Sequence, residues 1–112
     1  MRLARRFYII ENSSLSINRG WKGHYVEKRW FSCLQGVVKI AVSTIVEGGI
    51  DRNTIEVFCL TENTGDVLFV PEGYATIIRQ KEVGAKVIVF ADYLLGESQD
   101  ENIRWESGSM VL

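Results

Sequence analysis

The sequence predicts an all-β protein with little helix. About seven or eight short stretches rich in aromatic and β-branched residues follow one another at close spacing. The single proline and most of the ten glycines lie at the breaks between these stretches. Only residues 94–101 offer a short candidate helix. Many short strands at this spacing are typical of a β-sandwich or a β-barrel.

The expected strands are separated by turn residues. They cover residues 5–10, 29–35, 37–46, 54–60, 66–70, 74–79 and 85–90. Gly36, the pair Gly48-Gly49 and Pro71 interrupt the apolar pattern where the chain has to turn. The tail after Gly96 is polar, and we expect it to fray unless Trp105 is buried.

Alternation within the strands predicts which side chains share a face. One face of residues 37–46 carries Val38, Ile40 and Val42, and the other carries Lys39, Ala41 and Ser43. Residues 54–60 place Ile55, Val57 and Cys59 opposite Glu56 and Phe58. We interpret Cys33 and Cys59 as small buried hydrophobic residues in a reducing compartment, with a disulfide between them as the less favoured alternative.

Size and charge limit the possible functions. The 112 residues are enough for one core, so we expect a single domain over residues 1–112. The 13 basic and 14 acidic residues nearly cancel, which argues against nucleic-acid or membrane binding driven by net charge. We expect no secretory signal, because the apolar run after the N-terminal arginines spans only residues 7–10, and the cytoplasm is then the default location.

Two spaced motifs provide the main functional signal. The first consists of Lys22-Gly23-His24, Arg29 and Gly36; the second consists of Gly65, Pro71, Gly73 and Thr76. Their spacing matches the two motifs of metal-binding cupins, in which two histidines, a carboxylate and a third histidine hold one ion. Here those four positions are occupied by Lys22, His24, Arg29 and Thr76.

The exchange of ligands predicts a site that holds no metal. Lysine and arginine donate hydrogen bonds but offer no lone pair at neutral pH. One neutral ligand with two cations is therefore unsuited to a divalent ion. We expect a metal-free, positively charged cavity inside a single cupin jelly-roll barrel, suited to an anionic ligand or an anionic transition state.

Three segments of the first half carry a resemblance to a known family. Residues 6–9 (Arg-Phe-Tyr-Ile), the Arg19-Gly20-Trp21 segment with His24, and residues 33–36 (Cys-Leu-Gln-Gly) resemble the metal-free cupins that are dTDP-4-keto-6-deoxyglucose 3,4-ketoisomerases, the WxcM-like group. Residues 70–75, Asp92-Tyr93 and residues 103–105 are similar to dTDP-4-dehydrorhamnose 3,5-epimerases. The resemblance implies a homodimer that acts on a nucleotide-linked keto-sugar in surface polysaccharide synthesis, with no metal and no redox cofactor.

The chain departs from both groups. The ketoisomerases carry two histidines in this motif, and Lys22 replaces the first of them. The epimerases carry their catalytic histidine at that same position, and their catalytic tyrosine falls on Tyr93 or Leu94. The isomerase pair is thus half kept, and we favour isomerisation over epimerisation.

Both reactions begin with removal of a proton next to a ketone, which needs a base and a group that stabilises the enolate oxygen. His24, the only histidine, is the expected base. Lys22 is assigned to the enolate oxygen or to proton transfer, and Arg19 and Arg29 to the diphosphate. Tyr74 and Tyr93 could return the proton or stack on the base. Thr76, in the last motif position, is a further candidate for substrate binding.

Structural interpretations of the same residues stay open. A lone histidine in a β domain is commonly structural, and Lys22 and Arg29 could both be surface residues. Trp21, Trp30 and Phe31 are better explained as core or dimer contacts than as ligand platforms. The alternative function is a non-catalytic cupin that binds a nucleotide sugar.

Overall fold

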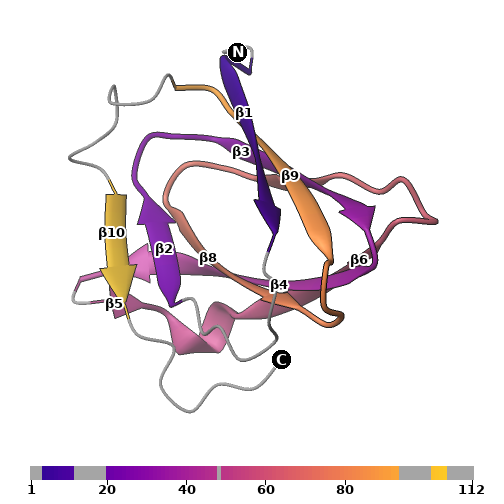
Figure 1. The fold of residues 1–112 in the computed structure, drawn as a ribbon. Coiled ribbons are helices and arrows are strands. Elements are labelled where there is room, and N and C mark those ends of the chain that lie inside the picture. Colours follow the sequence, from indigo (N-terminus) through magenta and orange to yellow (C-terminus); the bar gives the residue numbers. More distant parts are fainter. Residues whose placement is uncertain (1–3, 12–19, 48, 94–101, 106–112) are drawn as a thin grey trace.

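The computed structural model describes residues 4–11, 20–47 and 49–93, and the backbone of residues 102–105 (Figure 1). Its strands are β1 (Arg6–Glu11), β2 (Trp21–His24), β3 (Arg29–Gln35), β4 (Val37–Val46), β5 (Gly49–Ile50), β6 (Glu56–Thr61), β7 (Leu68–Val70), β8 (Tyr74–Gln80), β9 (Lys86–Ala91) and β10 (Asn102–Trp105). One 3₁₀ turn, η1 (Arg52–Thr54), begins after Asp51, whose side chain accepts a hydrogen bond from Asn53 N. The all-β prediction is confirmed. The candidate helix over residues 94–101 lies outside the described residues.

The strands form two antiparallel sheets. One has the order β1-β9-β3-β7, and the other has the order β10-β2-β8-β4-β5, with β6 paired to β4. Figure 1 shows the two sheets curling toward each other, as in a barrel. Strands far apart in sequence are neighbours, because β1 pairs with β9 and β2 pairs with β8. This order brings the N-terminal strand and the first motif into the same part of the molecule.

The main core lies between the two sheets. Its buried members come from β3, β4, β6, β7 and β9 and from the loop before β9: Phe31, Cys33, Val38, Ile40, Val42, Leu60, Val70, Ala85, Val87 and Val89. Ile40 in the longest strand is 0% exposed, in agreement with the face predicted for residues 37–46. Burying apolar side chains from both sheets in this layer is the main force that closes the barrel.

The other face of β4 is also covered. Trp21, Ala41, Ala75 and Ile77 form a second buried cluster, against which Ile45, Ile50 and Ile55 pack. Ser43 on this face is buried and donates a hydrogen bond to the carbonyl oxygen of Asp51. The six-stranded sheet is therefore apolar on both faces. Trp21 and Phe31 are both core residues, as the sequence indicated.

Strand β6 corrects one prediction. Phe58 packs against the main core and Leu60 is buried, whereas Val57 is 49% exposed and Cys59 is also exposed. The expected burial of Cys59 is wrong, because β6 pairs with β4 on one side only and its odd-numbered residues face away from the core. Cys33 is buried as expected, and neither cysteine forms a disulfide.

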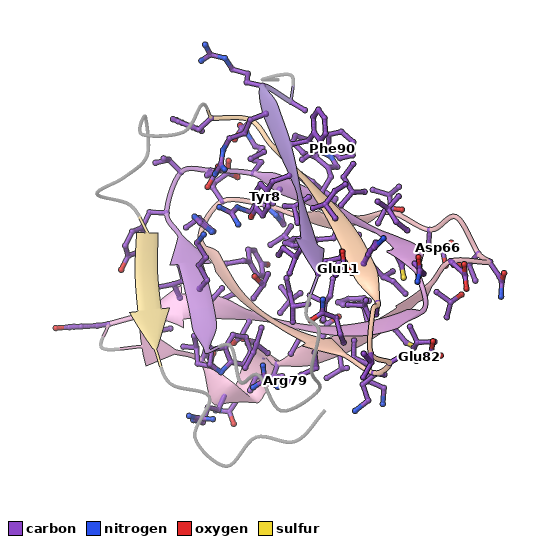
Figure 2. The ribbon with its side chains drawn as sticks, viewed as in Figure 1. Tyr8, Glu11, Asp66, Arg79, Glu82 and Phe90 are labelled. Carbon is purple, nitrogen blue, oxygen red and sulfur yellow. The ribbon has the colours of Figure 1, made fainter. Side chains whose placement is uncertain are left out.

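The outer face of the four-stranded sheet carries a row of aromatic side chains. The strand registers align Phe7 with Phe90, Phe90 with Trp30 and Trp30 with Phe69. The ring centroids of Phe7 and Phe90 are 5.9 Å apart, and those of Trp30 and Phe69 are 5.4 Å apart. Phe7 is 64% exposed and Phe69 is 46% exposed. Figure 2 shows Phe90 on this outer side, whereas Tyr8 from the neighbouring strand points inward.

Candidate active site

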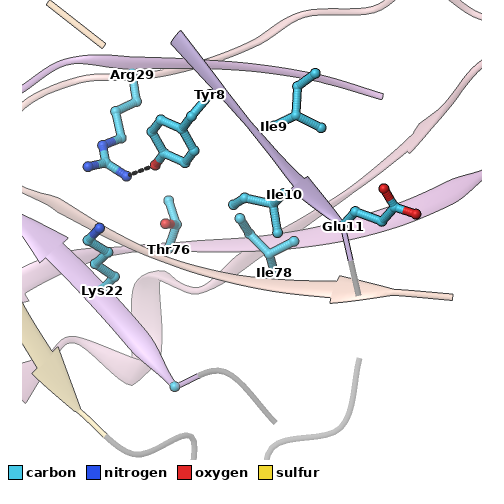
Figure 3. Close-up of a pocket in the computed structure, with 9 residues that line it drawn as sticks. Tyr8, Ile9, Ile10, Glu11, Lys22, Arg29, Thr76 and Ile78 are labelled. Carbon is cyan, nitrogen blue, oxygen red and sulfur yellow. Dashed lines mark hydrogen bonds between the residues drawn. The ribbon is translucent and has the colours of Figure 1, made fainter. Parts of the chain in front are cut away.

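A cavity of about 300 Å³ opens between β1, β2, β3 and β8. Its described lining residues are Tyr8, Ile9, Ile10, Glu11, Gly20, Lys22, Arg29, Thr76 and Ile78 (Figure 3). One part of the wall is apolar and formed by isoleucines. The other part holds a lysine, an arginine, a tyrosine and a threonine. This combination of apolar wall and few polar groups is the usual composition of a small-molecule site.

The strand registers explain why these side chains meet. Lys22 lies directly opposite Thr76 in the β2–β8 pair, so both reach the cavity from the same sheet. Arg29 is the first residue of β3 in the facing sheet, and Tyr8 is in the middle of β1. Three of the four cupin-motif positions, Lys22, Arg29 and Thr76, are thus on the cavity wall.

A buried carboxylate, Glu27, lies behind this wall and joins the basic residues. It is 1% exposed and follows β2 in the short connection to β3. Its Oε2 accepts hydrogen bonds from Arg29 Nη2 at 2.9 Å and from Arg29 Nε at 3.2 Å. Its Oε1 accepts one from Arg6 Nη2 at 3.0 Å. Two arginines from different strands therefore share one anion in the interior.

The backbone around Glu27 is held by a second acid. Asp92, at the end of β9, is buried and accepts a hydrogen bond from Lys28 N at 2.8 Å through its Oδ1. The backbone N–H of Asp92 donates to the Lys28 carbonyl at 3.2 Å. These two bonds extend the β3–β9 ladder and attach the end of the β2–β3 connection to it, which restricts where Glu27 can place its carboxylate.

Tyr8 connects the buried acid to the cavity. Arg29 Nη1 donates a hydrogen bond of 2.7 Å to the Tyr8 hydroxyl oxygen, the contact drawn in Figure 3. The guanidinium carbons of Arg6 and Arg29 lie 5.2 Å and 5.8 Å from the Tyr8 ring centroid. The tyrosine is therefore held between two cations, with its hydroxyl at the cavity wall.

His24 is buried beside this cluster. Its side chain is 4% exposed, and its Nδ1 lies 3.0 Å from Glu27 Oε2. The contact is within hydrogen-bonding distance but does not have the geometry of a hydrogen bond, and among the described residues Nε2 has no hydrogen-bond partner either. An unsatisfied buried imidazole nitrogen is uncommon in a folded protein and marks a group that either stores strain or serves chemistry.

The electrostatics fix the charge states near neutral pH. Burial lowers the pKa of His24 below its ordinary value of 6.5, with further lowering from Arg29 and Lys22 and an opposing effect from Glu27. Burial alone would raise the pKa of Glu27, but the contact with His24 and the charge of Arg29 outweigh it and lower the pKa from 4.5 to about 2. At pH 7 His24 is therefore neutral and Glu27 is ionised.

The structure separates the predicted site residues into two groups. Lys22, Arg29 and Thr76 line the cavity. His24 lies behind its wall, in contact with Glu27 rather than among the described lining residues. Arg29, assigned to a diphosphate from the sequence, has its Nε and Nη2 engaged by Glu27 and its Nη1 by Tyr8.

The two predicted tyrosines lie elsewhere in the described structure. Tyr74 lines a separate cavity of about 180 Å³ with Phe58, Leu68 and Pro71. Tyr93 follows β9, and its carbonyl oxygen accepts a hydrogen bond from Arg6 Nε at 3.0 Å. Neither is among the described residues that line the cavity with Lys22. Arg19 and Leu94 lie outside the described residues.

Sequence reasoning missed Tyr8 and Glu27. Tyr8 lies in β1, where Arg6, Tyr8 and Ile10 are half-buried and the residues between them are exposed. This alternation could have placed Tyr8 on the inner face. Glu27 has a weaker signal, an acid three residues after the only histidine and two before Arg29. An acid in a connection between strands is usually solvated, so its burial became visible only in three dimensions.

Among the described residues, no group of three or more His, Cys, Asp or Glu side chains is arranged to hold a metal ion. The described part of the chain also contains no helix that is long and apolar enough to span a membrane.

Comparison with known proteins gives a structural likeness and no sequence-level match. No protein-family model matches the chain. No curated protein matches it either. Among solved structures, the WlaRB TDP-quinovose 3,4-ketoisomerase from Campylobacter jejuni superposes with a TM-score of 0.72 at 20% identity, covering 91% of this chain and 71% of that one.

Two further structures give the same result. The 3,4-ketoisomerase QdtA from Thermoanaerobacterium thermosaccharolyticum, in complex with TDP-4-keto-6-deoxyglucose, has a TM-score of 0.73 at 21% identity and covers 91% of this chain and 67% of that one. A dTDP-4-dehydrorhamnose 3,5-epimerase from Bacillus anthracis has a TM-score of 0.77 at 13% identity. It covers 92% of this chain, which spans 59% of the epimerase. In its fold, this chain is therefore similar to TDP-sugar 3,4-ketoisomerases and dTDP-4-dehydrorhamnose 3,5-epimerases.

Proposed function

We propose that this protein isomerises a nucleotide-linked keto-sugar, a dTDP-4-keto-6-deoxyhexose, by a metal-independent 3,4-ketoisomerase reaction. The observation that carries the proposal is a cavity with Lys22 and Arg29 on its wall and a neutral imidazole, His24, buried directly behind it. A neutral base next to fixed cations is the arrangement that enolate chemistry needs. The fold shared with known ketoisomerases and epimerases supports the same function.

In the proposed reaction, His24 Nε2 takes the proton from sugar carbon C3. The electron pair of the broken C–H bond forms a C3=C4 double bond, and the C4 carbonyl oxygen becomes an enolate. Lys22 stabilises that oxygen by charge and by hydrogen bonding. The enolate oxygen at C4 then takes up a proton and the C3 hydroxyl gives up its proton. A further proton is delivered to carbon C4, which leaves a hydroxyl group at C4 and the ketone at C3.

The remaining polar residues are assigned to binding and proton return. Thr76 and Arg29 contact the sugar or its diphosphate from the two sheets, and Arg19 is retained for the diphosphate. The Tyr8 hydroxyl, held at the wall by Arg29, is a further donor or acceptor toward the sugar. Tyr74 and Tyr93 remain candidates from the family resemblance.

Deuterium labelling tests the proposal and identifies the reaction. The protein is incubated with dTDP-4-keto-6-deoxyglucose in deuterated water, and the sugar is analysed by NMR. Deuterium at C4 with the ketone at C3 is the expected result. Deuterium at C3 and C5 with the ketone still at C4 would show the epimerase alternative. No deuterium in the sugar at any protein concentration would refute both.

His24→Asn and Glu72→Gln serve as paired variants. His24→Asn should abolish deuterium uptake. Glu72→Gln changes an exposed carboxylate paired with Lys28 and should leave the uptake unchanged. Equal uptake in the parent and His24→Asn would exclude His24 as the base.

Binding without turnover is the second candidate function. It is favoured by the position of His24, which contacts Glu27 and is not among the described residues that line the cavity. In that case TDP should bind to the parent and to His24→Asn with equal affinity in calorimetric titrations. Lys22→Met should weaken TDP binding by about tenfold or more, because it removes a cation from the cavity wall. Deuterium uptake that depends on His24 would exclude this candidate.

A cytoplasmic homodimer is part of the proposal. The aromatic row of Phe7, Phe90, Trp30 and Phe69 supports self-association, because Phe7, Phe69 and Phe90 are exposed and a contiguous apolar patch on a sheet face is unfavourable in water. Light scattering after size exclusion should give a dimer for the parent and a monomer for Phe7→Ser/Phe90→Ser. A parent that is monomeric at all concentrations would refute the dimer.

A further inference from the structure

We propose that Glu27 is the positioning residue of this site, holding the imidazole of His24 so that Nδ1 carries the proton and Nε2 is presented as the reactive nitrogen. The inference rests on the proposed role of His24 as a base. Glu27 occupies none of the four ligand positions of the cupin motifs, and it is not among the described residues that line the cavity.

The first support is geometric. Glu27 Oε2 lies 3.0 Å from His24 Nδ1, and both side chains are almost fully buried. A carboxylate accepts and does not donate when it is ionised, so an imidazole nitrogen at this distance is favoured in its protonated form. The neutral ring carries a single N–H, and Nε2 is therefore left with its lone pair. Among the described residues neither ring nitrogen has a hydrogen bond of good geometry, and only Nδ1 has an acceptor, Glu27 Oε2, within hydrogen-bonding distance, which leaves Nε2 available to a substrate.

The second support is the rigidity of the carboxylate. Glu27 accepts three hydrogen bonds from two arginines that belong to β1 and β3. Its backbone is fixed through Lys28 by the two hydrogen bonds to Asp92. A carboxylate held from several directions can hold the ring in turn, whereas a mobile one would gain little over water.

The third support is charge balance around the ring. The charged groups that act on His24 are Lys22 on its own strand, Arg29 on β3 and Glu27. Arg6 and Tyr8 on β1 join the same cluster through Glu27 and Arg29, and Tyr74 on β8 is the register partner of His24. Lys22 and Arg29 disfavour a protonated ring, and Glu27 is the anion that opposes them. Without Glu27, the ring would face cations with no counter-charge, and its capacity to accept a substrate proton would fall.

Nitrogen NMR tests the inference without relying on turnover. Because the chain has one histidine, ¹⁵N-histidine labelling yields a single pair of ring signals. The parent should show a protonated Nδ1 and an unprotonated Nε2 in the neutral form. A parent whose neutral ring is protonated at Nε2 overturns the inference, and this measurement needs no variant that might misfold.

Variants then separate positioning from structural support. Glu27→Gln should lower the pKa of His24 further, because the amide carries no charge. It should also weaken the preference for a proton on Nδ1, because an amide can donate to that nitrogen as well as accept from it. In Glu27→Asp the pKa of His24 should stay closer to its value in the parent, because aspartate keeps the negative charge on a side chain that is one methylene shorter. Glu72→Gln is the matched control and should leave both ring signals in place. Identical His24 signals in Glu27→Gln and the parent would overturn the inference.

Activity gives the second readout. If the protein turns over the keto-sugar, Glu27→Gln should lower kcat on the order of 10- to 10³-fold with a smaller change in KM, because Glu27 does not touch the substrate. Deuterium uptake that is equal in Glu27→Gln and the parent would overturn the positioning role while leaving the proposed function intact. If the NMR result is as expected but the parent takes up no deuterium, the proposed function is refuted, while the position of the proton on the His24 ring stands.

Discussion

Replacing Glu27 by glutamine should make the stability of the protein much less dependent on acid. The pKa of Glu27 falls from 4.5 in the unfolded chain to about 2 in the folded protein. Because the folded value is depressed, the carboxylate stabilises the fold above pH 4.5, and this contribution is lost as the pH falls toward 2. This lowering of the pKa from 4.5 to about 2 corresponds to about 3 kcal/mol of stability at neutral pH, of which about 2 kcal/mol is lost by pH 3.

The variant adds a second effect at neutral pH. It leaves Arg6 and Arg29 without their shared anion in the interior, and removing one partner of a buried ion pair typically costs about 3–5 kcal/mol. The difference in unfolding free energy between the parent and Glu27→Gln should therefore be largest above pH 5. It should shrink by about 2 kcal/mol on lowering the pH to 3.

Urea unfolding followed by tryptophan fluorescence measures this difference. Midpoints and slopes are recorded for both proteins at several pH values between 6 and 2.5. The titration of His24 also lowers the stability of the protein as the pH falls, because burial lowers the pKa of His24. Comparing the proteins with and without Glu27→Gln in a His24→Asn background removes this contribution. Glu72→Gln, an exposed partner of Lys28, is the control and should differ from the parent by less than about 1 kcal/mol. A difference for Glu27→Gln that stays constant from pH 6 to pH 2.5 would refute an ionised, buried Glu27.

Three further outcomes are expected. Ile40→Ala should lower the unfolding free energy by about 2–5 kcal/mol, because Ile40 is 0% exposed. Val57→Ala, at a position 49% exposed, should lower the unfolding free energy by about 1 kcal/mol or less. If urea unfolding gave the same loss for Val57→Ala as for Ile40→Ala, the outward-facing position of Val57 on β6 would be contradicted. Gly36→Ala should destabilise more than Gly73→Ala: both glycines have positive φ, but only at Gly36 would the new Cβ lie 3.2 Å from Ala85 Cβ. Thermal unfolding of the two variants checks this order, and a larger loss for Gly73→Ala would contradict it. Finally, the acid limb of the pH–rate profile for deuterium uptake should lie below pH 6.5, because the neutral form of His24 is the base and its pKa is lowered. A limb above pH 6.5 would argue that another group titrates.

The regular strands of the fold could be predicted from the sequence. Residues 29–35 and 37–46 have the predicted bounds, because turn residues flank apolar runs and the alternation in 37–46 points one apolar face inward. Strand β10 was not predicted. It forms by pairing with β2, and such long-range pairing leaves little trace in local composition. The burial of Cys59 was predicted wrongly because both faces of β6 carry apolar residues, so period alone does not choose the inner one.

Regular strand alternation also allowed part of the candidate site to be predicted. The motif spacing predicted that Lys22, His24 and Arg29 converge, with Thr76 as a further candidate. Lys22, Arg29 and Thr76 line one cavity because strand alternation and the cupin frame are regular, and their roles in binding and catalysis stay predictions. The motif spacing carried no information on Glu27, which lies in a connection. Nor could it show that His24 turns toward that acid.

By itself, the sequence determined the period-two strands, the turn positions and the replacement of two metal-ligand positions by cations, since these depend on neighbours along the chain. Only the tertiary structure decided how the charges are shared. Arg6 and Glu27 are 21 residues apart and meet because β1 and β3 lie on either side of β9 in one sheet. Whether an interior arginine binds a ligand or a carboxylate depends on which groups the fold brings next to it. The fold places the Glu27 carboxylate 3.0 Å from Arg6.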